Sequence, residues 1–84
     1  MLYKMNIINV ELARIRLYAS IAEVRHTIVT FRIPFPEKEI FVINHENFEK
    51  AIEYMKNEGY YFLQITKFPK KEEMVITFKK EVLN

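Results

Sequence analysis

The hydrophobic positions of residues 45–58 recur with the period of an α-helix. The apolar stripe occupies positions i, i+3, i+4 and i+7 and consists of Phe48, Ala51, Ile52 and Met55. Asn44 precedes the stripe, and its side-chain oxygen can accept hydrogen bonds from the N–H groups of a first helical turn. Gly59, the only glycine, follows where a left-handed residue commonly ends a helix. The pattern predicts an amphipathic helix over about 45–58.

Residues 59–68 ("GYYFLQITKF") and 74–80 alternate instead with the period of two that is typical of β-strands. The charged segment 69–73 between them predicts a turn, so the two strands should form a hairpin. In the first strand both alternating sets contain large apolar side chains, including the aromatic residues Tyr60, Tyr61, Phe62 and Phe68. A half-buried strand normally has one polar set. The strand therefore raises the question of what covers its second face.

Residues 24–33 predict another strand, because β-branched residues are frequent there and apolar side chains alternate through Val29, Phe31 and Ile33. Two prolines within 34–39 fix the backbone and remove ladder donors, which predicts a turn. Residues 40–43 ("IFVI") then predict a short strand that leads into the helix.

The segment 10–20 fits two different periods. Small or apolar residues at 13, 15, 17 and 19 alternate with Arg14, Arg16 and Tyr18, as in a strand. A helical stripe also fits, consisting of Ile8, Leu12, Ile15, Ala19 and Ala22, and the Ala, Leu and Arg content favours a helix. Neither interpretation finds a Gly, Pro or Asn at 20–24 to make the following turn. We favour a strand at about 10–20 paired with 24–33, with the helix as the alternative.

These elements predict one small α+β domain over residues 1–84, with a mainly antiparallel sheet and the 45–58 helix packed on one face. The expected order is β-β-β-α-β-β, and the alternative is α-β-β-α-β-β. Half of the 84 residues are hydrophobic, which suffices for a single core.

The composition excludes several common chemistries. The chain has no Cys and no Asp, and its single Gly is already assigned to a helix end. Disulfides, thiolate metal sites, Ser-His-Asp triads and glycine-rich phosphate loops therefore lack their residues. We predict no cofactor, no metal site, no catalytic residue and no small-molecule substrate. The absence of Cys, of a long apolar run and of a signal peptide predicts a cytoplasmic protein without a membrane partner. Abundant Lys and Glu are typical of thermophiles, and also of proteins from AT-rich genomes.

The two histidines are candidates for proton or metal chemistry. His45 and Glu49 stand at i and i+4 of the predicted helix and could share a metal or a proton. His26 lies in the predicted 24–33 strand, where no triad partner is recognisable. We interpret both as surface residues.

Charge is unevenly distributed, although the net charge is only +2. Residues 1–33 contain all four Arg and have a net charge of +3. The net charge is −3 for residues 34–58 and +2 for residues 59–84. Such asymmetry is typical of a surface that meets a polyanion, or of segments that attract one another within or between copies of the chain.

The helix should cover one face of the sheet, against Tyr61, Leu63 and Ile65 of the first hairpin strand. The second face should then carry large apolar side chains that a partner would cover, namely Ile28, Tyr60, Phe62, Phe68 and Val75. Cationic residues that could contact a polyanion accompany them: Arg14, Arg16, Arg32 and Lys79.

Three kinds of contact can cover this second face. A second copy of the chain can bury it, bases of single-stranded nucleic acid can stack on its aromatic residues, or a helical N-terminal segment can fold over it. We predict a non-enzymatic interaction or assembly domain that forms a homodimer through the second face or the edge of its sheet. The alternative is a module that binds single-stranded nucleic acid with sheet aromatics and Arg or Lys.

Overall fold

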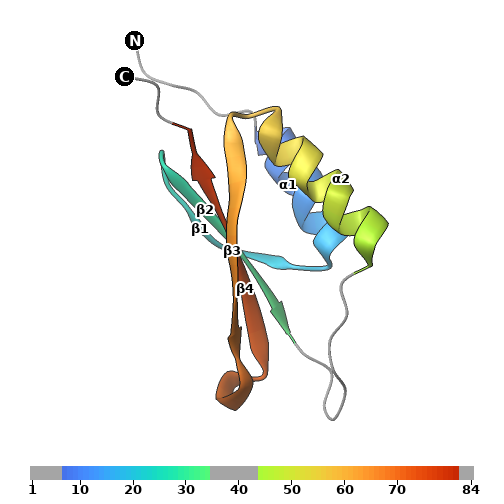
Figure 1. Ribbon diagram of the computed structural model, residues 1–84, viewed down its shortest axis with the longest axis vertical. Helices are drawn as coiled ribbons and strands as arrows, with labels where there is room; N and C mark the ends of the chain where they lie inside the picture. The colour runs from blue at the N-terminus through green and yellow to red at the C-terminus, as the bar shows by residue number, and fades with distance from the viewer. Residues whose placement is uncertain (1–6, 35–43, 82–84) are drawn as a thin grey trace.

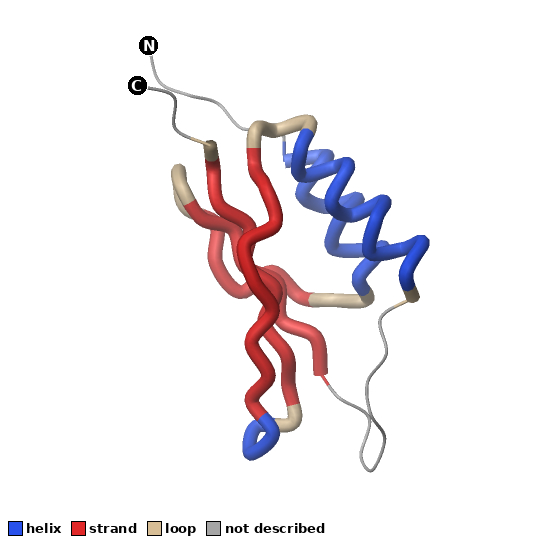
Figure 2. The backbone as a smooth tube through the Cα atoms, in the orientation of Figure 1, coloured by secondary structure: helices blue, strands red, loops and turns tan. Residues whose placement is uncertain are grey.

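A computed structural model of the protein describes residues 7–34 and 44–81 and confirms the α+β class (Figure 1). The elements follow in the order α1 (Ile7–Leu17), β1 (Ser20–Val24), β2 (Ile28–Pro34), α2 (His45–Lys56), β3 (Tyr60–Phe68), a short 3₁₀ turn (Pro69–Lys71) and β4 (Glu73–Lys80). The strands form one antiparallel sheet in the order β1-β2-β4-β3. Both helices lie on the same side of this sheet (Figure 2). We call the side away from the helices the open face.

The favoured prediction of a strand at 10–20 is wrong, because residues 7–17 form helix α1. The stripe that α1 buries is Val10, Ala13 and Leu17, each at most 1% exposed, and not the stripe that the sequence suggested. The helix ends in a Schellman motif, in which Tyr18 N–H donates to Ile15 O and Ala19 N–H donates to Arg14 O, both at 3.1 Å. Tyr18 occupies the left-handed position of this motif with φ 53°, where glycine is usual. The stop was missed because the residue that makes it is a tyrosine.

The segment 24–33 is also not one strand. A turn at 25–27 separates β1 from β2, and Arg25 N–H donates to Ile28 O across it at 2.7 Å. The described elements therefore follow the alternative order α-β-β-α-β-β, but its first two strands are β1 and β2 and do not include 40–43. That last segment lies outside the described residues.

Helix α2 begins and ends close to the predicted residues. The Asn44 side-chain oxygen accepts from Asn47 N–H at 3.0 Å, which is the expected N-cap. Gly59 N–H donates to Lys56 O at 2.9 Å, and Gly59 has φ 83°, which glycine adopts without strain. Both end signals are confirmed.

The core lies between the helices and one face of the sheet. Its buried members are Val10, Ala13, Leu17, Ala19, Val29, Phe31, Ile33, Ala51, Met55, Tyr60, Met74, Ile76 and Phe78. Three edge-to-face ring contacts join its layers, with centroid distances of 5.2 Å for Phe48–Phe62, 6.0 Å for Phe62–Phe78 and 5.8 Å for Phe31–Phe78. The aromatic chain connects α2 with β3, β4 and β2.

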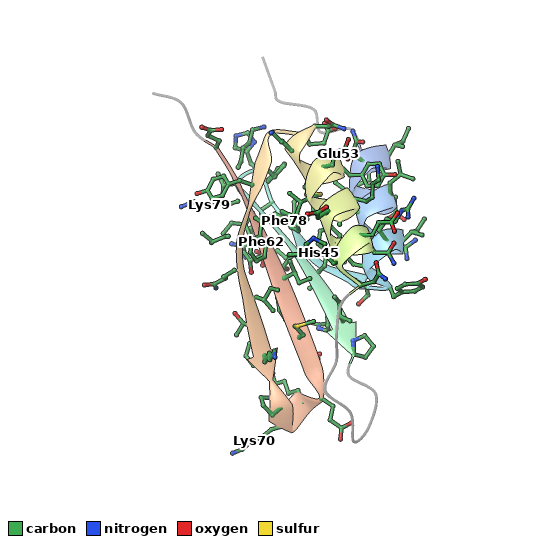
Figure 3. The ribbon with its side chains drawn as sticks, turned by 45° about the vertical axis from the view of Figure 1, so that its right-hand side comes forward. His45, Glu53, Phe62, Lys70, Phe78 and Lys79 are labelled. Atoms are coloured by element: carbon green, nitrogen blue, oxygen red, sulfur yellow. The ribbon has the colours of Figure 1, made fainter. Side chains whose placement is uncertain are left out.

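Two residues assigned to the second face point into this core instead. Tyr60 is 1% exposed, and Phe62 packs between Phe48 and Phe78. Figure 3 shows Phe62 and Phe78 on the helix side of the sheet, while Lys79 points away from it. The reason is a bulge at Leu63, which shifts the register between Phe62 and Gln64 and reverses the alternation along β3.

Beyond the bulge the predicted faces of β3 are confirmed, although Ile65 is 38% exposed and does not belong to the core. Gln64, Thr66 and Phe68 pair with open-face residues of β4, whereas Ile65 pairs with the buried Ile76. Tyr61, predicted to face the helix, pairs with Lys79 and lies on the open face. The bulge places Tyr60 and Phe62 in or against the core, whereas Tyr61, Leu63 and Ile65, the apolar residues of the other alternating set, are exposed.

Candidate functional site

Strand β3 forms one outer edge of the sheet and carries most of the exposed apolar side chains of the described strands. These side chains belong to Tyr61, Leu63, Ile65 and Phe68, and they are 38–45% exposed. Among the nine residues of β3 only Lys67 is charged. Edge strands of natural proteins are usually short or charged, because their free backbone groups can pair with another strand. Strand β3 is therefore the part of the sheet best suited to accept one.

The directions of the backbone groups along β4 follow from two hydrogen bonds at its end. Lys80 N–H donates to Thr27 O at 2.8 Å, toward β2, whereas Glu81 N–H donates to Gly59 O at 3.0 Å, toward β3. Because bonding direction alternates along an antiparallel strand, the even-numbered residues of β4 bond to β2 and the odd-numbered residues bond to β3.

The same alternation sets the directions in β3. The partners of Thr77, Val75 and Glu73 in the register are Gln64, Thr66 and Phe68, so residues 64, 66 and 68 turn their backbone groups toward β4. Between them, Ile65 and Lys67 turn their N–H and C=O groups outward from the sheet. These are the groups that an added strand would bond.

Two features limit where such a strand can bind. The bulge at Leu63 interrupts the edge and leaves residues 64–68 as its regular part. The opposite edge, β1, has only five residues, a register shift of its own between Ile21 and Glu23, and a Glu23–Arg25 ion pair at 3.4 Å. Short, bulged and charged edges resist pairing, so β1 is the protected edge of this sheet.

The open face is more polar than the sequence suggested. Three rows cross β2, β4 and β3, and they consist of Ile28–Lys79–Tyr61, Thr30–Thr77–Gln64 and Arg32–Val75–Thr66. Ile28 and Val75 are half-buried in this face, and Phe68 lies at its end. Of the five predicted interface residues, the structure places these three on the open face and Tyr60 and Phe62 in the core.

The four predicted polyanion contacts do not lie on one surface. Arg14 and Arg16 belong to the helix layer, where Arg14 Nη2 lies 2.9 Å from Glu11 and Arg16 Nη1 donates to Asn47 Oδ1 at 3.2 Å. Arg32 and Lys79 belong to the open face. Arg32 Nε lies 3.2 Å from a carboxylate oxygen of Glu73, which offsets its charge.

The two histidines lie at the surface, in different parts of the chain. His45 Nε2 lies 3.0 Å from Glu49 Oε1 on the exposed side of α2, and His26 lies exposed in the turn between β1 and β2. No group of three His, Cys, Asp or Glu side chains within 7–34 and 44–81 is arranged to hold a metal ion. Two surface hollows lie beside β3, one lined by α2 residues including Ile52 and one at the hairpin turn around Pro69, and neither contains a histidine.

Neither described helix is long and apolar enough to cross a membrane. No family model, curated protein or solved structure matches the chain.

Sequence reasoning missed part of the site that the structure shows. Tyr61, Leu63 and Ile65 were assigned to the core, yet they are among the exposed apolar side chains of the β3 edge. The available signal was the apolar character of both alternating sets in 60–68, because a strand with one buried face normally has one polar set.

Proposed function

We propose that this protein is a non-enzymatic assembly module that forms a homodimer by antiparallel pairing of its β3 edge with the β3 edge of a second copy. The observation that carries the proposal is the β3 edge, where four apolar side chains are 38–45% exposed and only one of the nine residues is charged. Strand addition at such an edge satisfies the outward backbone groups and removes exposed apolar area from water. The Cys-free composition suits a reducing cytoplasm, which is part of the same proposal.

The outward groups of β3 select one register for this pairing. When Ile65 pairs with the partner's Lys67, two-fold symmetry also pairs Lys67 with the partner's Ile65. Each of these two pairs exchanges backbone hydrogen bonds, and the two-fold axis passes between the two Thr66 residues. Gln64 then lies opposite the partner's Phe68. No two lysines face each other, so this register sets no like charges directly opposite one another.

The contact is short, and its strength should be modest. Five residues of each strand take part, and cross-strand side-chain pairs contribute roughly 0.2–1 kcal/mol each. We therefore expect a dimer that dissociates on dilution.

A disulfide at the two-fold axis tests the register directly. In this arrangement Thr66 forms a non-hydrogen-bonded pair, in which the Cα atoms lie about 4.5 Å apart, within the range that a disulfide spans. The chain has no other Cys, so Thr66→Cys under mild oxidation should give a covalent dimer, quantified by non-reducing electrophoresis.

The matched control is Thr77→Cys, which changes the same residue type on the same face but on central strand β4. Little covalent dimer should form with it. Equal cross-linking of the two variants, or a strict monomer of the unmodified protein at high micromolar concentration in size-exclusion chromatography with light scattering, contradicts the proposal.

The second candidate function is binding of single-stranded nucleic acid on the open face. Tyr61 lies beside Lys79 in the register, so an aromatic ring and a cation are adjacent there, as base stacking and phosphate contact require. The Arg32–Glu73 ion pair and the position of Arg14 and Arg16 in the other layer weaken this candidate. It predicts salt-dependent binding of oligonucleotides that Lys79→Glu abolishes. No binding at low salt removes it.

A further inference from the structure

Helix α1 presents a second apolar surface, on the side away from its own core. Ile8, Leu12 and Ile15 are 62%, 38% and 55% exposed, whereas the opposite stripe of the same helix is buried. Ile7 and Tyr18, at the two ends of the helix, are exposed as well. We call Ile8, Leu12 and Ile15 the outer ridge.

The ridge has the spacing of a helix–helix contact. Its members are separated by four and then three residues, which is the d-a-d spacing of a coiled-coil heptad, and they follow one line along the helix. The stripe of Val10, Ala13 and Leu17 already packs α1 within its own chain, so this packing does not explain why the outer ridge is apolar. The outer ridge is therefore suited to a partner helix.

The charged borders of the ridge indicate which partner fits. At 100° per residue, Glu11 lies along one side of the ridge and Arg16 along the other. Arg16 Nη1 donates to Asn47 Oδ1 of α2 at 3.2 Å, and the guanidinium has further N–H groups for a second acceptor. The Glu11 side chain is 45% exposed, and it contacts Arg14 on the side away from the ridge. A carboxylate has two oxygens and can accept from a second guanidinium. One border is thus acidic and the other basic.

We propose that the outer ridge packs against the outer ridge of a second copy, with the two α1 helices parallel. When two such helices are related by a two-fold axis along their length, the acidic border of each meets the basic border of the other. Glu11 then faces the partner's Arg16 on both sides, the spacing of five residues that joins g and e positions in parallel coiled coils. An antiparallel pair would bring Glu11 against Glu11 and Arg16 against Arg16.

This contact uses the opposite side of the helix layer from the sheet, so it does not compete with pairing at β3. It also does not depend on that pairing. A chain with two different two-fold contacts can associate beyond the dimer, because each copy offers one surface to each of two neighbours.

Sedimentation velocity on a small set of variants separates the two contacts. Ile65→Lys would set like charges opposite each other at the β3 edge in the proposed register, and it should leave a dimer that depends on α1 alone. In that background Leu12→Glu should give a monomer. Val24→Glu, an exposed apolar residue of β1 outside both surfaces, is the matched control and should change nothing.

Charge exchange in the Ile65→Lys background tests the parallel orientation. Glu11→Arg or Arg16→Glu alone should weaken the dimer about tenfold, whereas the two together should restore it to within about threefold. An Ile65→Lys protein that is already monomeric at high micromolar concentration overturns the α1 contact, and a double exchange that fails to restore the dimer overturns the parallel orientation. If Ile65→Lys leaves association as it is in the unmodified protein, the β3 proposal fails while the α1 contact stands.

Discussion

Three described residues have positive φ, and only one of them is glycine. Tyr18 and Glu72 both have φ 53°, and Gly59 has φ 83°. A residue with a Cβ costs roughly 1–2 kcal/mol in this region, so the helix end at Tyr18 is maintained against a local penalty. The burial of Leu17 and Ala19 on either side of it offsets that penalty.

Substitutions at Gly59, after α2, and at Tyr18, after α1, should change the free energy of unfolding in opposite directions. Gly59→Ala should lower the free energy of unfolding by about 1 kcal/mol, because the nearest atom to an added Cβ is Lys80 Cε at 3.9 Å and the cost is therefore that of the backbone alone. Tyr18→Gly should raise it by about 0.5 kcal/mol, because relief of the left-handed tyrosine exceeds the entropy cost of a glycine. Denaturant unfolding followed by circular dichroism measures both, and destabilisation by Tyr18→Gly would contradict the assignment.

The sequence predicted the two ends of α2, where the residue type is one that helix ends prefer, and missed the C-terminal end of α1, where it is not. Asn44 and Gly59 have the side chain and the freedom that their positions require, so propensity alone identified them. Tyr18 has neither. Its conformation is imposed by the packing of the segments on both sides, and residue propensities do not predict such an effect.

The element that sequence patterns described least well is α1. Because it has apolar residues on two sides, its sequence fits both the period of a strand and that of a helix. The more apolar stripe, which was predicted to face the core, is the exposed one. The smaller stripe of Val10, Ala13 and Leu17 is the buried one, and α1 packs against α2. Which side faces inward was decided by the fit between elements, since hydrophobicity alone does not distinguish the two.

Truncation on the two sides of α1 should therefore have unequal effects. Leu17→Ala should lower the free energy of unfolding by about 2–5 kcal/mol, because Leu17 is fully buried. Ile15→Ala should change it by less than about 0.5 kcal/mol when measured at low protein concentration, since its side chain is largely in water. Thermal or denaturant unfolding of the two variants gives the comparison, and equal losses would contradict the assigned orientation of the helix.

Strand β3 shows a second limit of periodicity. One bulge at Leu63 changed the face of every residue on its N-terminal side, so Tyr60 and Phe62 were misplaced while Gln64, Thr66 and Phe68 were placed correctly. Such a bulge depends on pairing with β4 and leaves no residue signature comparable to a proline. The alternating pattern of β4, where Met74, Ile76 and Phe78 are buried as predicted, has no interruption.

At the scale of the whole molecule, the class and the packing of α2 on the sheet were predictable because they follow from one clear amphipathic stripe and a hairpin. The spatial order of the strands was not, because chain order does not determine which strand lies at an edge. Edge position is what makes the apolar residues of β3 available to a partner, so the candidate site could be only partly identified from the sequence.

Association should stabilise the folded protein by mass action. The thermal midpoint should rise by about 3–5 °C for each tenfold increase in protein concentration, because a dimer binds only folded chains. Differential scanning calorimetry over two decades of concentration measures this shift. The variant with both Ile65→Lys and Leu12→Glu should show no dependence on concentration, and a midpoint of the unmodified protein that is equally constant would contradict association through either surface.

The position of β4 has a consequence for how the chain acquires its structure. Strand β4 follows β1, β2 and β3 in the chain, yet it lies between β2 and β3 in space. While the protein is being synthesised, β2 and β3 have no partner on their inner sides until residues 73–80 have left the ribosome. Strand β4 pairs with β2 at sequence separations of 39 to 51 residues and joins β3 to the β1–β2 hairpin, so the four strands form one sheet only when β4 has paired with both neighbours. We therefore expect the core to close in one late step, and the apolar β3 edge to be exposed before that step.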